Sequence, residues 1–133
     1  MENKINVVAA AIIKDHHLLV ARRAPHLKHG GLWELPGGKV EDAETDEIAL
    51  TREISEELNL TIVVSDHVAE SLVEVNGRWI QMRVYQSVVH DFSELRLADH
   101  SAIKWITAGE LFDLEWAPAD VPLLDKLSLL LSG

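Results

Sequence analysis

The stretch from Gly37 to Leu60 constrains the fold most strongly, because it ends in a helix that would repel itself in plain water. Glu53, Glu56 and Glu57 stand at positions i, i+3 and i+4, so an α-helix places their carboxylates on one face. Like charges at that spacing destabilise an isolated helix. Clustered oxygen ligands suit Mg²⁺ or Mn²⁺, which commonly bridge substrate phosphates. We therefore expect this face to hold a divalent cation.

The same helix carries an apolar stripe beside the acidic one. Leu50, Ile54 and Leu58 recur at i, i+4 and i+8, which predicts that the helix packs on a sheet while its acidic face borders a cleft. Thr45 is a favoured residue at a helix start, and Asn59 tolerates the left-handed conformation that often ends a helix. A solvated acidic helix would explain the charge, but not the Gly-Gly-Lys before it or the arginine inside it. We therefore expect a docked helix bounded by Thr45 and Asn59.

The rest of the chain alternates between strand and turn signals. The dipeptide Asn76-Gly77 is among the strongest short signals for a hairpin. Thr107 and Glu110 have the spacing of a capping box, and the leucines after Pro122 give one apolar helical face. Strands are predicted at residues 4–14, 18–24, 61–75, 78–90 and 102–106. This pattern indicates an α/β protein with a mixed sheet.

Length and charge narrow the class of protein. A chain of 133 residues is long enough for one domain, so we predict a single domain over residues 1–133, as a monomer or homodimer. The formal net charge of −10 argues against nucleic-acid polymers and anionic membranes as partners. Cysteine is absent, and the apolar run from Val7 to Ile13 lacks a cleavage site, so we read it as a strand and expect a cytoplasmic protein.

The acidic helix and its lead-in resemble a known family. Eight residues fit the spacing G-x5-E-x7-R-E-U-x-E-E-x-G-U, where U is a bulky aliphatic residue: Gly38, Glu44, Arg52, Glu53, Ile54, Glu56, Glu57 and Leu60. Residues 38–60 therefore resemble a Nudix box, with Asn59 in place of the usual glycine. The resemblance implies the Nudix α/β/α sandwich, in which a mixed β-sheet lies between helices.

Three further runs, ARRAP, LWELPGGKVE and WAPADVPLLDKL, resemble the MutT branch of nucleoside triphosphate pyrophosphohydrolases. Within that branch they look closest to the CTP pyrophosphohydrolases. The resemblance implies a small nucleotide substrate that is hydrolysed to the monophosphate and pyrophosphate, with Mg²⁺ or Mn²⁺ as cofactor. The metal would activate the attacking water and neutralise charge on the leaving phosphate.

The resemblance also suggests roles for individual residues. It implies metal ligation by Glu53, Glu56, Glu57 and the Gly38 carbonyl. Arg52 is expected to orient a neighbouring glutamate, because an arginine inside an acidic cluster has few other partners. The general base is either a box glutamate or an acidic residue from the loop before the last strand, which here is Asp99, although a plain loop aspartate fits the sequence nearly as well.

Basic residues outside the box are candidate phosphate contacts. Arg22 and Arg23 end a predicted strand, so one of them can reach a cleft while the other meets solvent, and two surface arginines would look the same. We name Arg23 as a substrate contact, together with Lys39, which follows two glycines, and Arg78. His26 and His29 are three residues apart with no third ligand nearby, so we expect no zinc site in that loop.

Asp120 is the predicted contact with the base. In the WAPAD run, MutT-like proteins for oxidised guanine resemble this chain but carry an asparagine. An ionised aspartate only accepts hydrogen bonds, so Asp120 is predicted to accept from the exocyclic amino group of cytosine. Guanine also has donors, so cytosine is favoured without excluding guanine. The alternative interpretation is that Asp120 only caps the last helix.

Three functions compete. The first is a pyrophosphohydrolase for CTP, dCTP or 5-substituted dCTP. The second is an enzyme for another substrate, such as 8-oxo-dGTP, ADP-ribose or a dinucleoside polyphosphate. ADP-ribose and dinucleoside polyphosphates are disfavoured as substrates, because relatives that use them tend to carry proline or tyrosine where Val75 to Arg78 lie here. The third is a module that binds a nucleotide without cleaving it, which would be expected to have lost box glutamates.

Overall fold

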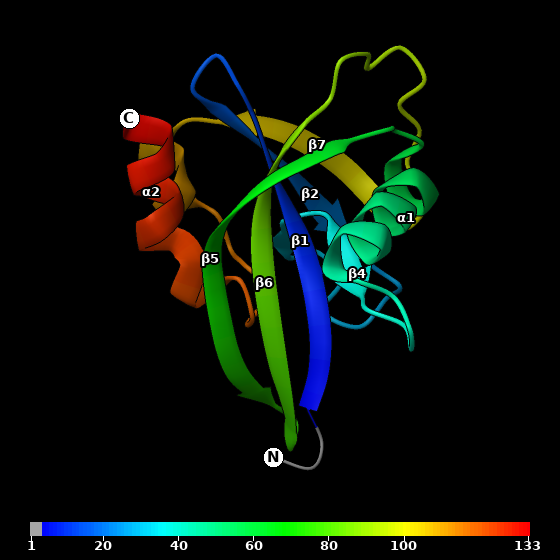
Figure 1. Cartoon of the computed structure of the whole chain (residues 1–133). Helices are drawn as coiled ribbons and strands as arrows, with labels where there is room; N and C mark the ends of the chain where they lie inside the picture. The colour runs from blue at the N-terminus through cyan, green and yellow to red at the C-terminus, as the bar shows by residue number, and fades with distance from the viewer. Residues whose placement is uncertain (1–3) are drawn as a thin grey trace.

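The computed structural model describes residues 4–133 as a mixed β-sheet flanked by helices. The strands are β1 (Lys4–Lys14), β2 (His17–Arg23), β3 (Trp33–Glu34), β4 (Gly37–Lys39), β5 (Val63–Val75), β6 (Arg78–Val88) and β7 (His100–Ile106). The helices are α1 (Asp46–Leu58), α2 (Leu124–Ser132) and the 3₁₀ helices η1 (Ala108–Asp113) and η2 (Val121–Leu123). Figure 1 shows α1 and α2 on opposite sides of the sheet, which confirms the predicted α/β/α sandwich.

The sheet is organised around β1. The strand order is β3-β2-β1-β6-β5, with β4 paired to β1 and β7 paired to β2. β1 runs parallel to β6 and antiparallel to its other neighbours. On its second edge, Val7 to Ala9 pair with β4, while Ile13 and Lys14 pair with β2. This division of one edge places the glycines of β4 at the centre of the sheet.

The two faces of β1 belong to two separate cores. Ala9 and Ala11 pack with the leucines of α2, whereas Val8, Ala10 and Ile12 pack with α1. Strand neighbours point to opposite faces, so a strand that is covered on both sides must be apolar throughout. This burial explains the continuous apolar run that predicted the first strand.

Helix α1 has the boundaries that the sequence predicts. The Thr45 hydroxyl accepts a hydrogen bond from the Ile48 N–H at 3.2 Å, and Asn59 adopts the left-handed conformation with φ 56°. Leu50, Ile54 and Leu58 are fully buried against the sheet. Each such side chain contributes roughly 1.5–3 kcal/mol of burial free energy, which offsets the repulsion on the acidic face.

Other local predictions are confirmed with some changes of detail. Asn76 and Gly77 both have positive φ, as a tight hairpin turn requires. The Glu110 carboxylate accepts from the Thr107 N–H at 3.0 Å, but the helix that follows is 3₁₀ rather than α. Strand β7 begins at His100, two residues earlier than predicted. None of the helices in residues 4–133 combines the length and apolarity that a membrane crossing needs.

Candidate functional site

The Arg52 guanidinium binds three carboxylates of the acidic stretch. Its Nε and Nη2 donate to the two oxygens of Glu44, both at 2.8 Å, and its Nη1 donates to Glu53 at 2.9 Å and Glu56 at 3.3 Å. Nη2 also donates to the Lys39 carbonyl at 3.0 Å. The hydrogen bond from Arg52 lowers the pKa of Glu44 to about 2. Arg52 therefore neutralises part of the cluster and fixes the direction of the Glu53 carboxylate.

Gly38 lies directly against Glu53. A Cβ atom added to Gly38 would lie 2.3 Å from Cδ of Glu53, which is far closer than any van der Waals contact allows. Burial raises the pKa of Glu53, and the Arg52 guanidinium opposes this rise. Glycine is therefore needed at position 38 so that the Glu53 carboxylate can pack against the backbone of β4.

The three box glutamates occupy three different environments. The Glu56 side chain is 59% exposed, whereas that of Glu53 is 16% exposed. Glu57 is buried, and its Oε1 accepts from the Gly37 N–H at 3.1 Å. Burial raises the pKa of Glu57 to about 7. The predicted acidic face therefore ranges from the exposed Glu56 to Glu57, which is buried against the backbone of β4.

These residues fit a hard divalent cation. Glu53 and Glu56 approach the same Arg52 nitrogen, so their carboxylates lie close together, and Glu57 reaches the backbone of Gly37 from the next turn. The donors are carboxylate oxygens beside a strand backbone without side chains, which is the oxygen-rich set that Mg²⁺ and Mn²⁺ prefer. The assignment of Gly38, Glu53, Glu56 and Glu57 as ligands stays a prediction.

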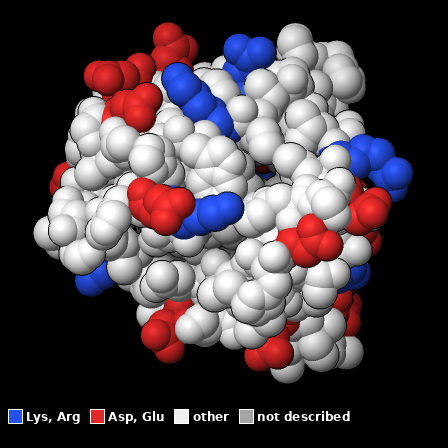
Figure 2. Space-filling model, turned by 90° about the horizontal axis from the view of Figure 1, so that it is seen from above, with Lys and Arg blue, Asp and Glu red and all other residues white. Residues whose placement is uncertain are grey.

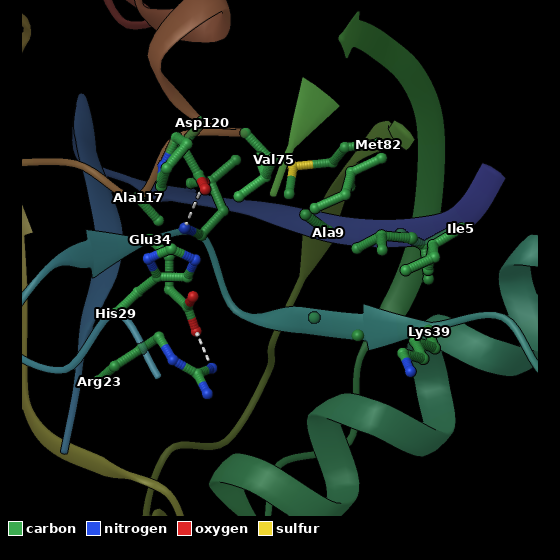
Figure 3. A pocket seen from close by; sticks show the side chains of 18 of the residues that line it. Ile5, Ala9, Arg23, His29, Glu34, Lys39, Val75, Met82, Ala117 and Asp120 are labelled. Atoms are coloured by element: carbon green, nitrogen blue, oxygen red, sulfur yellow. Dashed lines mark hydrogen bonds and ion pairs between the residues drawn. The ribbon is translucent and has the colours of Figure 1, made fainter. Parts of the chain in front are cut away.

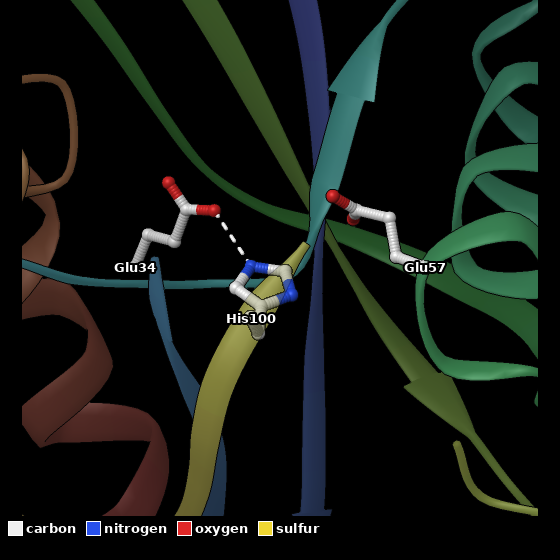
Figure 4. Close-up of side chains that lie close together, drawn as sticks. All are labelled: Glu34, Glu57 and His100. Carbon is white, nitrogen blue, oxygen red and sulfur yellow. Dashed lines mark hydrogen bonds and ion pairs between the residues drawn. The ribbon is translucent and has the colours of Figure 1, made fainter. Parts of the chain in front are cut away.

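A second cluster lies on the buried side of Glu57. Figure 4 shows the His100 ring between the carboxylates of Glu34 and Glu57. His100 Nε2 lies 2.9 Å from Glu34 Oε2, and one potential ligand atom from each of the three residues lies within 4.8 Å of the others. The His100 side chain is fully buried. Neither His100 nor Glu34 was singled out from the sequence, because only the pairing of β2 with β3 and with β7 brings them together.

Asp99, by contrast, lies outside this cluster. Its side chain is exposed and makes no hydrogen bond or ion pair with the described residues, while its backbone carbonyl accepts from the Ala24 N–H at 3.1 Å. Asp99 lies in the bend that precedes β7, whereas His100 is the first residue of that strand and is buried. The role of Asp99 as general base stays a prediction.

A pocket of about 440 Å³ opens beside Gly37 and Gly38. Its aliphatic wall comes from β1 and β6 and includes Ile5, Ile80 and Met82. The four predicted substrate contacts all line this one pocket, although they come from distant parts of the chain: Arg23, Lys39, Arg78 and Asp120. Figure 3 shows Lys39 at one end, beside α1, and Asp120 at the other. Arg23 lies on the same side of the pocket as Asp120 and Glu34, so the cations that line the pocket are spread along it.

Asp120 does not cap the last helix. Its side chain makes no capping hydrogen bond at η2, and its Oδ2 accepts instead from the Leu35 N–H at 2.9 Å. The residue is buried, and burial raises the pKa of its carboxyl group to about 8. The capping interpretation is therefore wrong for Asp120, and burial favours the protonated form of its carboxyl group in the free protein.

Arg23 and Arg22 point to opposite faces of β2, as strand alternation predicts. Arg23 lines the pocket, where its Nε donates to the Lys28 carbonyl at 2.9 Å and its Nη1 lies 3.4 Å from Glu34 Oε2. Arg22 is exposed and lies over the Trp33 ring at 5.7 Å. Glu34 therefore connects Arg23, a pocket residue, with His100 beside the box helix.

Charge on the outer surface is mixed in sign. On the face seen in Figure 2, Lys and Arg side chains lie singly, several of them beside Asp or Glu. This face of the described residues offers no continuous basic track of the kind that binds a phosphate backbone.

Comparison with known proteins places this site in context. Residues 3–127 match the NUDIX domain. A Mycobacterium tuberculosis protein, provisionally named 8-oxo-dGTP diphosphatase 2, is 42% identical over 137 positions, which cover 100% of this chain and 94% of that protein. The CTP pyrophosphohydrolase of Escherichia coli K12 is 40% identical over 127 positions, covering 95% and 93%. The solution structure of the Escherichia coli ORF135 protein gives a TM-score of 0.82 at 39% identity, covering 96% of this chain and 91% of that one.

Proposed function

Because the chain belongs to the Nudix family and is a nucleotide pyrophosphohydrolase of that family, we propose that it hydrolyses CTP, dCTP or a 5-substituted dCTP to the monophosphate and pyrophosphate. One observation carries this proposal: a single pocket is bordered by the box glycines at one end and by buried Asp120 at the other. The first end suits a polyphosphate and the second suits a base.

The chain's own residues have distinct tasks in this reaction. Glu53, Glu56 and Glu57, with the Gly38 backbone, would hold a divalent cation, which when bound polarises a phosphoryl oxygen and activates water. Arg52 holds Glu53 and Glu56 in place. A box glutamate is one candidate for the base that takes a proton from the attacking water. Asp99 remains the alternative base.

The cations that line the pocket would bind the phosphates. Lys39 directly follows the glycines of β4, and Arg23 is held toward the pocket by Lys28 and Glu34. A guanidinium presents a fixed fork of donors to phosphate oxygens, while an ammonium acts as a point charge. Arg78 lines the same pocket from β6. We propose that these three cations offset the charge of the triphosphate.

Asp120 would read the base. In its ionised form it accepts from the amino group of cytosine, whereas uracil and thymine present a carbonyl there. In its protonated form it both donates and accepts, which is the pattern that an oxidised guanine edge requires. The pKa of about 8 and the Mycobacterium tuberculosis relative favour 8-oxo-dGTP as the second candidate. A non-catalytic module is disfavoured because all box glutamates are present.

A substrate panel tests the proposal. The protein is incubated with Mg²⁺ and CTP, dCTP, 5-methyl-dCTP, UTP, dTTP, dGTP or 8-oxo-dGTP, and both products are identified by anion exchange. We expect monophosphate and pyrophosphate, with ¹⁸O from labelled water in only one of them. A kcat/KM for 8-oxo-dGTP above that for every cytosine nucleotide would replace the first candidate by the second. Orthophosphate as the primary product would overturn both.

A further inference from the structure

The imidazole of His100 has an unpartnered nitrogen. Nε2 lies 2.9 Å from Glu34 Oε2, and because an ionised carboxylate only accepts, this nitrogen carries a proton. In the neutral ring, Nδ1 then has a free lone pair. Within residues 4–133 it is the one buried side-chain nitrogen or oxygen atom that has no hydrogen-bond partner. Buried polar atoms are nearly always paired, so this atom indicates a ligand that the described chain does not supply.

The surroundings of His100 carry excess negative charge. The Glu34 side chain is 15% exposed and Glu57 is buried. Among the described residues, Glu34 is reached by the His100 Nε2–H at 2.9 Å and by the Arg23 guanidinium at 3.4 Å, while the hydrogen-bond donor to the Glu57 carboxylate is the Gly37 N–H. Two largely buried carboxylates with so little compensation are costly, and a bound cation would offset that cost.

The three side chains are also spaced as ligands. Two ligands about 2.1 Å from a zinc ion lie roughly 3.0–3.4 Å apart for octahedral or tetrahedral angles. For Nε2 to bind the ion, the proton that it donates to Glu34 must first move to Nδ1 or leave the ring. The 2.9 Å separation between Nε2 and Glu34 Oε2 is then close to this range, and ligand atoms of all three residues lie within 4.8 Å of one another. Small rotations of the glutamate side chains would bring the third ligand to the same spacing.

The donor set points to a transition metal rather than Mg²⁺. Imidazole suits Zn²⁺ and similar ions, whereas Mg²⁺ favours carboxylate, carbonyl and water oxygen. We propose that Glu34, Glu57 and His100 form a Zn²⁺ site that lies on the inner side of the box helix and shares Glu57 with the predicted Mg²⁺ ligands. Zinc binding there would occupy Glu57, which is also a predicted Mg²⁺ ligand, and would break the contact between Glu34 and Arg23. Zn²⁺ would therefore inhibit hydrolysis, and this consequence alone rests on the proposed function.

Zinc titration of the whole chain tests the binding site directly. In Mg²⁺-free, chelator-treated buffer, we expect one equivalent of Zn²⁺ to bind, measured by calorimetry, and one ring nitrogen of His100 to shift in a long-range ¹H–¹⁵N spectrum. The shifted nitrogen identifies the ligating atom. His100→Gln should weaken binding at least tenfold, whereas His26→Gln, in the exposed 25–31 loop, should leave it unchanged. If circular dichroism shows that His100→Gln does not fold, Glu34→Gln replaces it as the test variant. The ¹H–¹⁵N spectrum of the wild-type protein tests the site without any substitution.

Several outcomes would overturn the site. They are the absence of zinc binding, binding that His100→Gln leaves unchanged, and a ring shift at His26 or His29 instead of His100. Glu56→Gln separates the two metal sites, because it should abolish Mg²⁺-dependent hydrolysis while retaining zinc binding. If zinc binds but no nucleotide is hydrolysed with Mg²⁺, the proposed function fails and this site stands. If hydrolysis proceeds and zinc does not bind, only this site fails.

Discussion

Arg52 holds Glu44 through two hydrogen bonds of 2.8 Å, although eight positions separate the two residues along the chain. This bidentate pair joins the loop before α1 to the middle of the helix. The remaining Arg52 nitrogen is then directed at Glu53 and Glu56. Glu44 therefore acts on the predicted metal ligands through the orientation of Arg52.

Arg52→Lys tests this arrangement. Lysine keeps the charge but cannot bind Glu44 with two parallel hydrogen bonds while also reaching Glu53. We expect kcat to fall at least tenfold, about 1.4 kcal/mol in transition-state stabilisation, with a smaller change in KM. Arg22→Lys serves as the matched control, because Arg22 is an exposed residue of β2 outside the acidic cluster. Equal activity of the two variants in steady-state assays would contradict the assigned role.

The box glutamates should be separable by their burial. Glu56→Gln and Glu57→Gln should each lower kcat by orders of magnitude, and wild-type activity should vanish in excess chelator. Only Glu57→Gln should raise the melting temperature of the metal-free protein at pH 8, because it removes a buried charge. Glu47→Gln, on the exposed first turn of α1, is the control for both measurements. Undiminished turnover in either box variant would refute the assignment.

Gly38→Ala should remove activity through a single methyl group. The new Cβ would lie 2.3 Å from Cδ of Glu53, so the Glu53 carboxylate must move away from β4. We expect a loss of at least a hundredfold in kcat/KM, about 2.7 kcal/mol. Gly109→Ala is the control, because no neighbouring atom lies within 4 Å of the added Cβ there. If Gly38→Ala binds and hydrolyses normally, the contact has no functional role.

Asp120 should govern how stability varies with pH. Burial raises its folded-state pKa from 3.8 to about 8, so between these values the folded protein binds a proton that the unfolded chain does not. Its contribution is therefore complete below about pH 4 and is lost as the pH rises toward 8. We expect the melting temperature of the wild type to fall more steeply than that of Asp120→Asn between pH 5 and 8. Parallel curves would show that Asp120 is not protonated in the fold.

The same variant tests base recognition. We expect kcat/KM for CTP or dCTP to exceed that for UTP or dTTP by tenfold or more, about 1.4 kcal/mol, and Asp120→Asn to narrow this gap. Because the carboxyl group does not cap η2, loss of discrimination cannot be attributed to a frayed helix. Asp125→Asn, at the start of α2, controls for the change of charge. A preference that survives in Asp120→Asn would place base selection elsewhere in the pocket.

Local interactions explain why so much of α1 could be predicted. The Thr45 cap, the left-handed Asn59 and the stripe of Leu50, Ile54 and Leu58 all depend on residues within two or three helical turns. The Asn76-Gly77 hairpin depends on two residues. Such features are encoded by spacing and by backbone preference, so the sequence pattern indicated the box helix and a mixed α/β protein, while the family resemblance implied the α/β/α sandwich.

The graded environment of the glutamates depends on tertiary packing. Glu56 and Glu57 are adjacent and chemically identical, yet one is exposed and the other is buried against Gly37. The helical period places both near one face, but it does not specify which of them contacts β4. That contact depends on how α1 packs on the strands beneath it, which no local pattern contains.

Long-range strand pairing assembled the rest of the site. His100 meets Glu34 across 66 positions, and Asp120 meets the Leu35 N–H across 85. Alternation along a strand restricts a side chain to one of two faces, but only the register between strands decides which residues become neighbours. The sequence by itself therefore determined the family, the box helix and the candidate phosphate contacts. Tertiary structure decided that Asp120 is a buried pocket residue and that His100, rather than Asp99, lies beside the box, because both outcomes depend on contacts between distant segments.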